Sequence, residues 1–143
     1  MPFTYEYPRP CVSADVVVVS EDELFVLLIQ RKKDPFAGSW ALPGGFMDMD
    51  ESAELAAVRE LKEETELEVD SVQQIGAYSS VDRDPRARVV TIAFFARAST
   101  TDHIAAADDA ADAKWFPFDQ LPELAFDHAT IIDDARQKFI NQS

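Results

Sequence analysis

Two short apolar segments near the amino end predict the first strands of a sheet. Residues 12–19 are rich in β-branched side chains and residues 24–30 form a second apolar run, with the polar residues 20–23 between them. β-branched runs bounded by polar turn residues are typical of strands. We therefore expect a β-hairpin here, followed by a loop over residues 31–45, which contain two prolines and three glycines.

The remaining pattern predicts a strongly helical segment, three more strands and a closing helix. The first helix is expected over residues 52–65, the strands over 72–81, 88–98 and 114–116, and the closing helix over 128–141. This order, β-β-α-β-β-β-α, predicts an α/β fold in which a mixed sheet carries a helix on each face. No repeat or linker divides the sequence, so residues 1–143 are expected to form a single domain.

The charge balance makes one class of partner unexpected. The chain has 27 acidic and 13 basic residues and a net charge of −14 at pH 7. Such a surface repels phosphate backbones, so non-specific binding to nucleic acid is not expected. A small polyphosphate can still bind where divalent cations lie between its phosphates and the carboxylates of the protein. We therefore expect a small-molecule partner.

Cysteine content and hydropathy indicate the compartment. Cys11 is the single cysteine, which excludes an intramolecular disulfide. The first ten residues carry Pro, Tyr, Glu and Arg where a signal peptide needs an apolar stretch. The longest apolar runs are far shorter than the ~20 residues that cross a membrane. We expect a cytoplasmic protein that is neither exported nor membrane-inserted.

Candidate chemistry concentrates in residues 45–67. Within the expected helix, Glu60, Glu63 and Glu64 are spaced i, i+3 and i+4, which places three carboxylates on one stripe. Carboxylates so close repel one another unless a cation lies among them, and oxygen ligands suit Mg²⁺ or Mn²⁺. Arg59 lies one turn before Glu63 and can hold its carboxylate. An ordinary solvated acidic face is the alternative interpretation.

The whole segment matches a longer pattern, G-x5-E-x7-R-E-U-x-E-E-x-G-U, in which U is aliphatic. The matching residues are Gly45, Glu51, Arg59, Glu60, Leu61, Glu63, Glu64 and Leu67. On these residues the chain resembles the Nudix hydrolases. Segments at 31–46, 82–89, 108–110, 115–117 and 125–128 resemble the ADP-ribose pyrophosphatase branch of that family. The resemblance implies an α/β/α sandwich that hydrolyses a nucleoside diphosphate derivative, with ADP-ribose, cleaved to AMP and ribose 5-phosphate, as the leading substrate.

The resemblance also implies metal and catalytic residues. The ligands of Mg²⁺ or Mn²⁺ are expected among Gly45, Glu60, Glu63 and Glu64. The catalytic residues are expected to be Arg59, Glu63, Glu64 and Asp109. In relatives, a carboxylate from a loop after the box often serves as general base. Here the loop offers Asp102, Asp108, Asp109 and Asp112, of which Asp108 or Asp109 is preferred, while Glu63 or Glu64 can serve instead.

Arginines and aromatic residues outside the box are candidates for substrate contact. Arginine binds phosphate through two parallel N–H donors, and an aromatic ring can stack on adenine. For the arginines of residues 83–88, the alternative is a solvated hairpin tip. For four aromatic rings the alternative is packing in the core: Phe36, Trp40, Phe46 and Tyr78. His103 and His128 are expected to lie outside the mechanism. The expected substrate-binding residues are Arg31, Phe46, Arg83, Arg86 and Arg88.

One position departs from the pattern, because Glu66 stands where the box has its final glycine. A glycine there ends the helix with a positive φ, and a residue with a Cβ in that conformation costs ~1 kcal/mol. We interpret Glu66 first as a strained or rebuilt helix end. A gained metal ligand is the second interpretation.

Two other functions stay open on the sequence. A Nudix enzyme that cleaves (d)NTPs or oxidised nucleotides uses the same box with a different base pocket. Some relatives are non-catalytic ADP-ribose sensors, in which a Nudix domain is fused to a winged-helix DNA-binding domain. This acidic chain ends soon after its second expected helix and is not expected to carry that domain. Related enzymes are often dimers with a shared substrate site, so the resemblance implies a homodimer.

Overall fold

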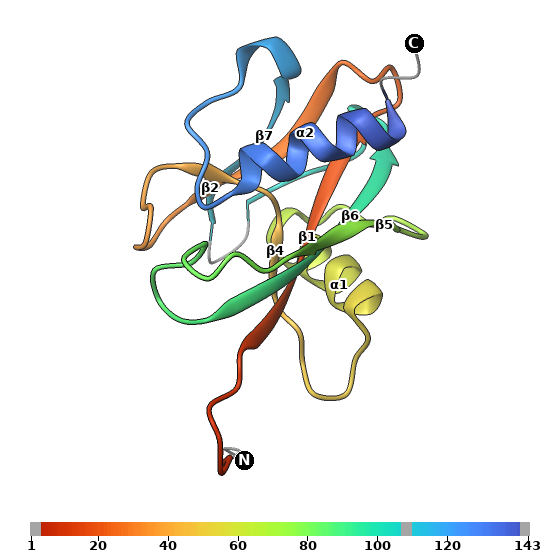
Figure 1. The fold of residues 1–143 in the computed structure, drawn as a ribbon. Coiled ribbons are helices and arrows are strands. Elements are labelled where there is room, and N and C mark those ends of the chain that lie inside the picture. Colours follow the sequence, from red (N-terminus) through yellow and green to blue (C-terminus); the bar gives the residue numbers. More distant parts are fainter. Residues whose placement is uncertain (1–3, 107–109, 141–143) are drawn as a thin grey trace.

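The computed structural model describes residues 4–106 and 110–140, whose elements follow one another as Figure 1 shows. In chain order these are β1 (Cys11–Ser20), β2 (Phe25–Arg31), β3 (Trp40–Ala41), β4 (Gly44–Phe46), α1 (Ala53–Thr65), β5 (Gln73–Tyr78), β6 (Val89–Ala98), β7 (Ala110–Pro117), the 3-10 helix η1 (Phe118–Gln120) and α2 (His128–Phe139). No helix within these described ranges is long and apolar enough to cross a membrane.

The described strands form one seven-stranded sheet around β1. The order β3-β2-β1-β6-β5 runs across the sheet, while β4 pairs with β1 and β7 pairs with β2. β1 and β6 are parallel over their whole lengths, and the other pairings are antiparallel. The antiparallel pairing of β1 with β2 confirms the expected hairpin, and the sheet as a whole is mixed, as predicted.

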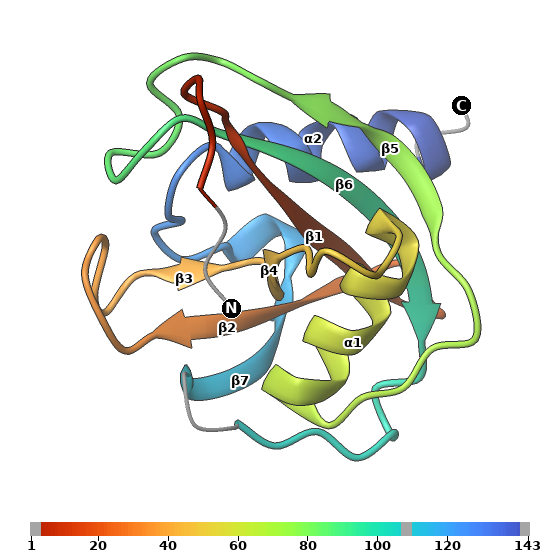
Figure 2. The same cartoon turned by 90° about the horizontal axis from the view of Figure 1, so that it is seen from below.

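A helix covers each face of the sheet, as Figure 2 shows. Successive side chains of a strand point to opposite faces. Ala14, Val16 and Val18 of β1 accordingly pack into the cluster beneath α1, whereas Val17 and Val19 pack into the cluster beneath α2. All five side chains are fully buried. The expected α/β/α sandwich is confirmed, and β1 is the strand that both cores share.

The loop expected over residues 31–45 is wrong in its second half, because two short strands lie there. β3 pairs with β2, and β4 pairs with β1 with Gly45 opposite Ala14. Glycine and proline are depleted in strands, which hides such short pairings from the sequence pattern. The strand expected at 114–116 is the longer β7, and the closing helix ends at Phe139. Residue 141, the expected end of that helix, lies outside the described residues.

Local signals fix both ends of α1. The side chain of Ser52 accepts a hydrogen bond from the N–H of Leu55, which caps the amino end of the helix. At the other end Glu66 has a φ of 64° and donates its N–H to the Lys62 carbonyl at 2.8 Å. Of the two forms expected for this helix end, strained or rebuilt, the structure shows the strained left-handed one. The Glu66 carboxylate is 3.7 Å from His103 Nε2, and its side chain is 55% exposed.

Replacing Glu66 with glycine should stabilise the protein. Glycine adopts a positive φ without the Cβ penalty, so Glu66→Gly is expected to raise the free energy of unfolding by about 1 kcal/mol. Thermal or urea unfolding measures the change, and Glu66→Ala, which keeps the Cβ, should give no such gain. A less stable Glu66→Gly variant would show that the flexibility of glycine in the unfolded chain outweighs the relief.

Candidate active site

A cavity of about 370 Å³ lies where β1, β4 and α1 meet the loops of the opposite layer. Its acidic lining comes from five carboxylates, and its basic lining comes from five arginines and lysines. The acidic residues are Asp15, Asp34, Glu60, Glu64 and Asp84, and the basic residues are Arg31, Lys32, Lys33, Arg83 and Arg86. The cavity therefore carries both charges, although the chain as a whole is strongly acidic.

Two adjacent glycines of β4 form the wall of the cavity nearest α1. Gly44 donates its N–H to the Glu64 carboxylate, with oxygen distances of 3.2 and 3.3 Å. A Cβ on Gly44 would collide with Asp15 and with the Ala14 carbonyl, and a Cβ on Gly45 would lie 2.6 Å from the Glu60 carboxylate. Only residues without a side chain allow this close approach of β4 to its neighbours.

Arg59 links three acidic residues of the box, Glu51, Glu60 and Glu63, to one another. Its Nε and Nη2 atoms donate to Glu51 at 2.9 and 2.6 Å, and its Nη1 atom donates to Glu60 at 2.8 Å and Glu63 at 3.0 Å. Nη2 also donates to the Phe46 carbonyl at 3.2 Å. The hydrogen bond from Arg59 lowers the pKa of Glu51 to about 2. The expected contact between Arg59 and Glu63 is present within a larger network.

The three glutamates of the expected stripe occupy different surroundings. Glu60 and Glu64 line the cavity, and burial raises the pKa of Glu60 against the opposing hydrogen bond from Arg59. Glu64 is buried. Glu63 has a side chain that is 58% exposed, and it is not among the lining residues. Among the described residues, no group of three or more acidic, His or Cys side chains is arranged to hold a metal ion.

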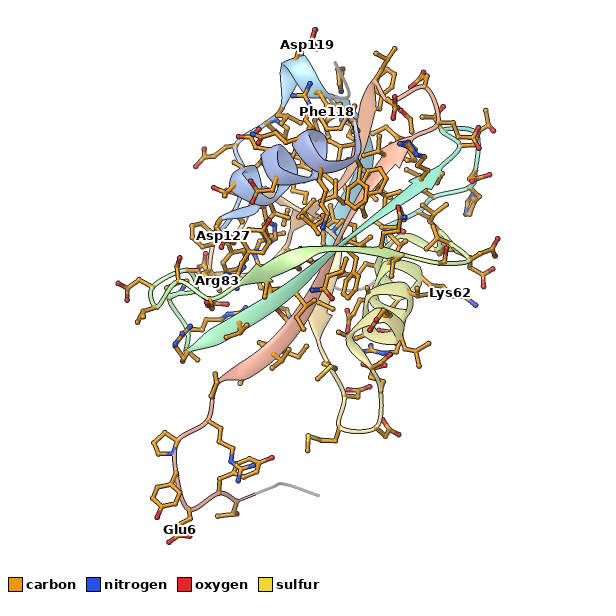
Figure 3. All side chains as sticks on the ribbon, turned by 45° about the vertical axis from the view of Figure 1, so that its right-hand side comes forward. Glu6, Lys62, Arg83, Phe118, Asp119 and Asp127 are labelled. Atoms are coloured by element: carbon orange, nitrogen blue, oxygen red, sulfur yellow. The ribbon has the colours of Figure 1, made fainter. Side chains whose placement is uncertain are left out.

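Some of the arginines expected to bind substrate line the cavity, and one does not. Arg31, Arg83 and Arg86 line the cavity, whereas Arg88 is exposed and is not a lining residue. Arg83 is almost fully buried and forms a two-bond ion pair with Asp127, at 2.9 and 2.7 Å, and Figure 3 shows the two side chains beside each other. The loop before β6 thus places Arg83 and Arg86 against the cavity and is not a free hairpin tip, although Arg88 at its end is exposed.

Arg86 is fixed by a carboxylate of its own loop. Its Nε and Nη2 atoms donate to Asp84 at 3.1 and 2.7 Å. Burial acts to raise the pKa of Asp84, but the hydrogen bonds from Arg86 outweigh burial and lower it. Asp84 therefore stays ionised and holds the Arg86 guanidinium at the cavity wall.

The aromatic candidates separate into cavity and core residues. Phe46 lines the cavity and is 45% exposed. Trp40 packs edge-on against Phe116 with 4.7 Å between ring centroids, and Tyr78 donates its hydroxyl to Asp134 at 2.6 Å. Phe126 also lines the cavity, although it was not among the aromatic residues predicted to contact substrate. Core packing was therefore the right interpretation for Trp40.

A buried polar group on the cavity wall was also missed. Asp15 accepts a hydrogen bond from Thr91 Oγ1 at 2.6 Å and lies 3.8 Å from His128 Nε2. His128 Nδ1 accepts the Leu42 N–H at 3.0 Å, so the proton of the neutral ring lies on Nε2. A carboxylate within the apolar run of residues 12–19 was a usable signal for Asp15, because a buried charge needs a partner. His128 was expected to take no part in the mechanism, and the structure places it among the residues that line the cavity.

None of the loop carboxylates considered for the general base is a cavity residue among those that the structure describes. Asp102 is exposed and accepts the Ser99 N–H at 3.3 Å, and Asp112 in β7 accepts the N–H of its neighbour Ala113. Neither lines the cavity. Asp108 and Asp109, the preferred candidates, lie outside the described residues.

Comparisons with known proteins identify the family. The model of the NUDIX domain matches residues 9–135. An ADP-ribose pyrophosphatase from Methanocaldococcus jannaschii is 44% identical over 128 residues, which cover 90% of this chain and 74% of that protein. The ADPR responsive transcriptional repressor NtrR from Acinetobacter baylyi is 31% identical over 144 residues, covering 96% of this chain and 58% of the repressor.

A solved structure agrees with these relatives. The NUDIX domain of Shewanella oneidensis NrtR complexed with ADP ribose superposes with a TM-score of 0.83 at 34% identity, covering 92% of this chain and 90% of that domain. The chain therefore belongs to the NUDIX domain family, as the box at residues 45–67 indicated.

The two glycines of β4 should respond differently to an added methyl group. In Gly45→Ala the new Cβ displaces only the end of the Glu60 side chain, so the fold should persist while hydrolysis falls by about 100-fold. In Gly44→Ala the Cβ meets backbone atoms, which should destabilise the protein by about 2 kcal/mol. Thermal unfolding and turnover are measured on both variants. Equal loss of stability in the two would contradict this account.

Burial of His128 predicts a pH-dependent stability. Burial lowers the pKa of His128 below its ordinary value of 6.5. Between the lowered pKa and the ordinary one, the histidine is therefore protonated in the unfolded chain but neutral in the folded protein. The wild type should therefore lose stability relative to His128→Asn as the pH falls below about 6.5, and the loss should grow until the folded-state pKa is reached. Asparagine can still accept the Leu42 N–H. Urea unfolding of both proteins between about pH 7.5 and 5.5 measures the difference, and a constant difference would refute the assignment.

Proposed function

We propose that this chain hydrolyses ADP-ribose to AMP and ribose 5-phosphate in a reaction that requires Mg²⁺ or Mn²⁺. Similarity to an ADP-ribose pyrophosphatase over most of the chain supports the substrate. The observation that carries the proposal is the meeting, in one cavity, of two carboxylates from α1 with the guanidinium groups of Arg31, Arg83 and Arg86. A diphosphate with its divalent cation complements both sets of charges.

The residues present fit a hard divalent cation. Glu60 and Glu64 offer carboxylate oxygens at the cavity wall, and burial disfavours the charge of Glu60 until a cation compensates it. We assign the metal to Glu60, Glu64 and the adjacent Gly45, with Glu63 as a further ligand of the set. When bound, the ion would neutralise the diphosphate and lower the pKa of an attacking water.

The protein's own groups would orient the substrate and the acids. Arg59 holds Glu60 and Glu63 through one guanidinium nitrogen, so it fixes the direction of two carboxylates at once. Arg31, Arg83 and Arg86 would bind phosphate oxygens, and Phe46 would pack against the nucleoside. Asp109 is proposed as the general base, with Glu63 or Glu64 as the alternative.

Wider features of the proposal follow from the sequence. We take residues 1–143 as one domain that acts in the cytoplasm as a homodimer, on a small nucleotide and without nucleic acid or membrane as partners. The net charge of −14 supports the choice of a small ligand, since metal ions can bridge it to an acidic protein whereas a long phosphate backbone is repelled.

A second candidate function is binding of ADP-ribose without hydrolysis. It is favoured by the similarity to NtrR, described as an ADPR responsive repressor, and to an NrtR domain complexed with ADP ribose. Two measurements separate hydrolysis from binding alone. Turnover with Mg²⁺ is measured for ADP-ribose, NADH, sugar nucleotides and dNTPs, and binding of each compound is measured by calorimetry. Fastest turnover of ADP-ribose supports the proposal, binding without turnover supports the sensor, and preference for dNTPs refutes both.

Glu64 provides the sharpest test of the metal assignment. Glu64→Gln keeps the shape of the side chain and an oxygen that can accept the Gly44 N–H, so the fold should persist. Loss of the negative charge is expected to lower turnover by about 100-fold or more and to raise the metal concentration required. Glu68→Gln, at an exposed position outside the box, is the matched control. Turnover of Glu64→Gln within about twofold of wild type would reject the assignment.

A further inference from the structure

Phe126 is a cavity residue whose place in the molecule is fixed by strained backbone. Its φ is 53°, a left-handed conformation that a bulky residue rarely adopts. The preceding residue, Ala125, donates its N–H to the Trp40 carbonyl at 2.8 Å. The Phe126 ring packs edge-on against Phe36, with 4.9 Å between ring centroids. These contacts hold the ring at the cavity wall.

Two guanidinium groups lie over this one ring. The central carbon of Arg31 is 5.0 Å from the ring centroid of Phe126, and that of Arg86 is 5.6 Å away. Arg31 donates its Nε to the Pro35 carbonyl at 2.7 Å, and no ion pair joins it to a carboxylate within residues 4–106 and 110–140. Burial, and then the neighbouring charge of Arg86, lowers the pKa of Arg31. The ring therefore lies beside two cations that repel each other.

We infer that Phe126 is a positioning residue that holds Arg31, and together with Asp84 holds Arg86, where both guanidinium groups bind the diphosphate of the substrate. This inference rests on the proposed function of the cavity. The negative face of an aromatic ring attracts cations and offsets part of their mutual repulsion. A guanidinium already held in place loses less conformational entropy when it binds phosphate. Phe126 thus acts through the arginines, and its effect falls on substrate affinity.

The test replaces the ring while keeping an apolar side chain. Phe126→Leu removes the aromatic face, whereas Phe126→Tyr keeps an aromatic ring at this position. Phe118→Leu is the matched control, because Phe118 lies under Arg136, at 4.5 Å from the ring centroid, and does not line the cavity; Figure 3 labels Phe118 on η1. Thermal unfolding establishes that each variant folds, and Phe126→Met replaces Phe126→Leu if the latter does not. KM and kcat for ADP-ribose are measured with Mg²⁺, and binding of inorganic pyrophosphate is measured by calorimetry.

Phe126→Leu should raise KM about tenfold and weaken pyrophosphate binding by a similar factor, with kcat within about threefold of wild type. Phe126→Tyr and Phe118→Leu should stay within about twofold for KM. If the wild type does not hydrolyse ADP-ribose while Phe126→Leu still weakens pyrophosphate binding, only the proposed function fails. Three outcomes would overturn the positioning role. They are an unchanged KM in Phe126→Leu, an increase of KM in Phe126→Tyr as large as that in Phe126→Leu, and a wild type that does not bind pyrophosphate.

Discussion

Close packing of backbone at β4 is the constraint on which the site depends. Gly44 fits against Asp15 and the backbone of β1, while Gly45 faces the Glu60 carboxylate with no side chain between them. The Gly44 N–H also binds Glu64. A strand of three residues thus joins the central strand of the sheet to the acidic helix. A side chain at Gly45 would push the Glu60 carboxylate aside, and a side chain at Gly44 would collide with Asp15 and the backbone of β1.

The sequence predicted what local rules decide. Apolar periodicity located the main strands. The spacing of the box located α1, the contact between Arg59 and Glu63, and an altered helix end at Glu66. These features depend on neighbours within a few residues. The hidden strands β3 and β4 were missed because their pairing is decided by partners in β1 and β2, which outweigh the poor strand propensity of glycine.

Side-chain positions in the cavity depended on contacts distant in sequence and could not be predicted in the same way. Helical spacing put Glu60, Glu63 and Glu64 on one stripe, but it does not say how far a cavity extends around that stripe, and Glu63 lies beyond its lining. At the cavity, the His128 ring accepts the N–H of Leu42, 86 residues earlier. Spacing along the chain carries no information about such a contact.

The alternation of β1 has a consequence for how this fold tolerates change in chain length. Its side chains fill one hydrophobic core with every second residue and the opposite core with the residues between, and it pairs in parallel with β6 from Cys11 to Ser20. A strand with period two exchanges its faces when it slips by one residue. A single-residue insertion within β1 would therefore exchange the two faces for the residues on one side of the insertion and disrupt both cores at once, whereas the surface turns can absorb insertions without such exchange.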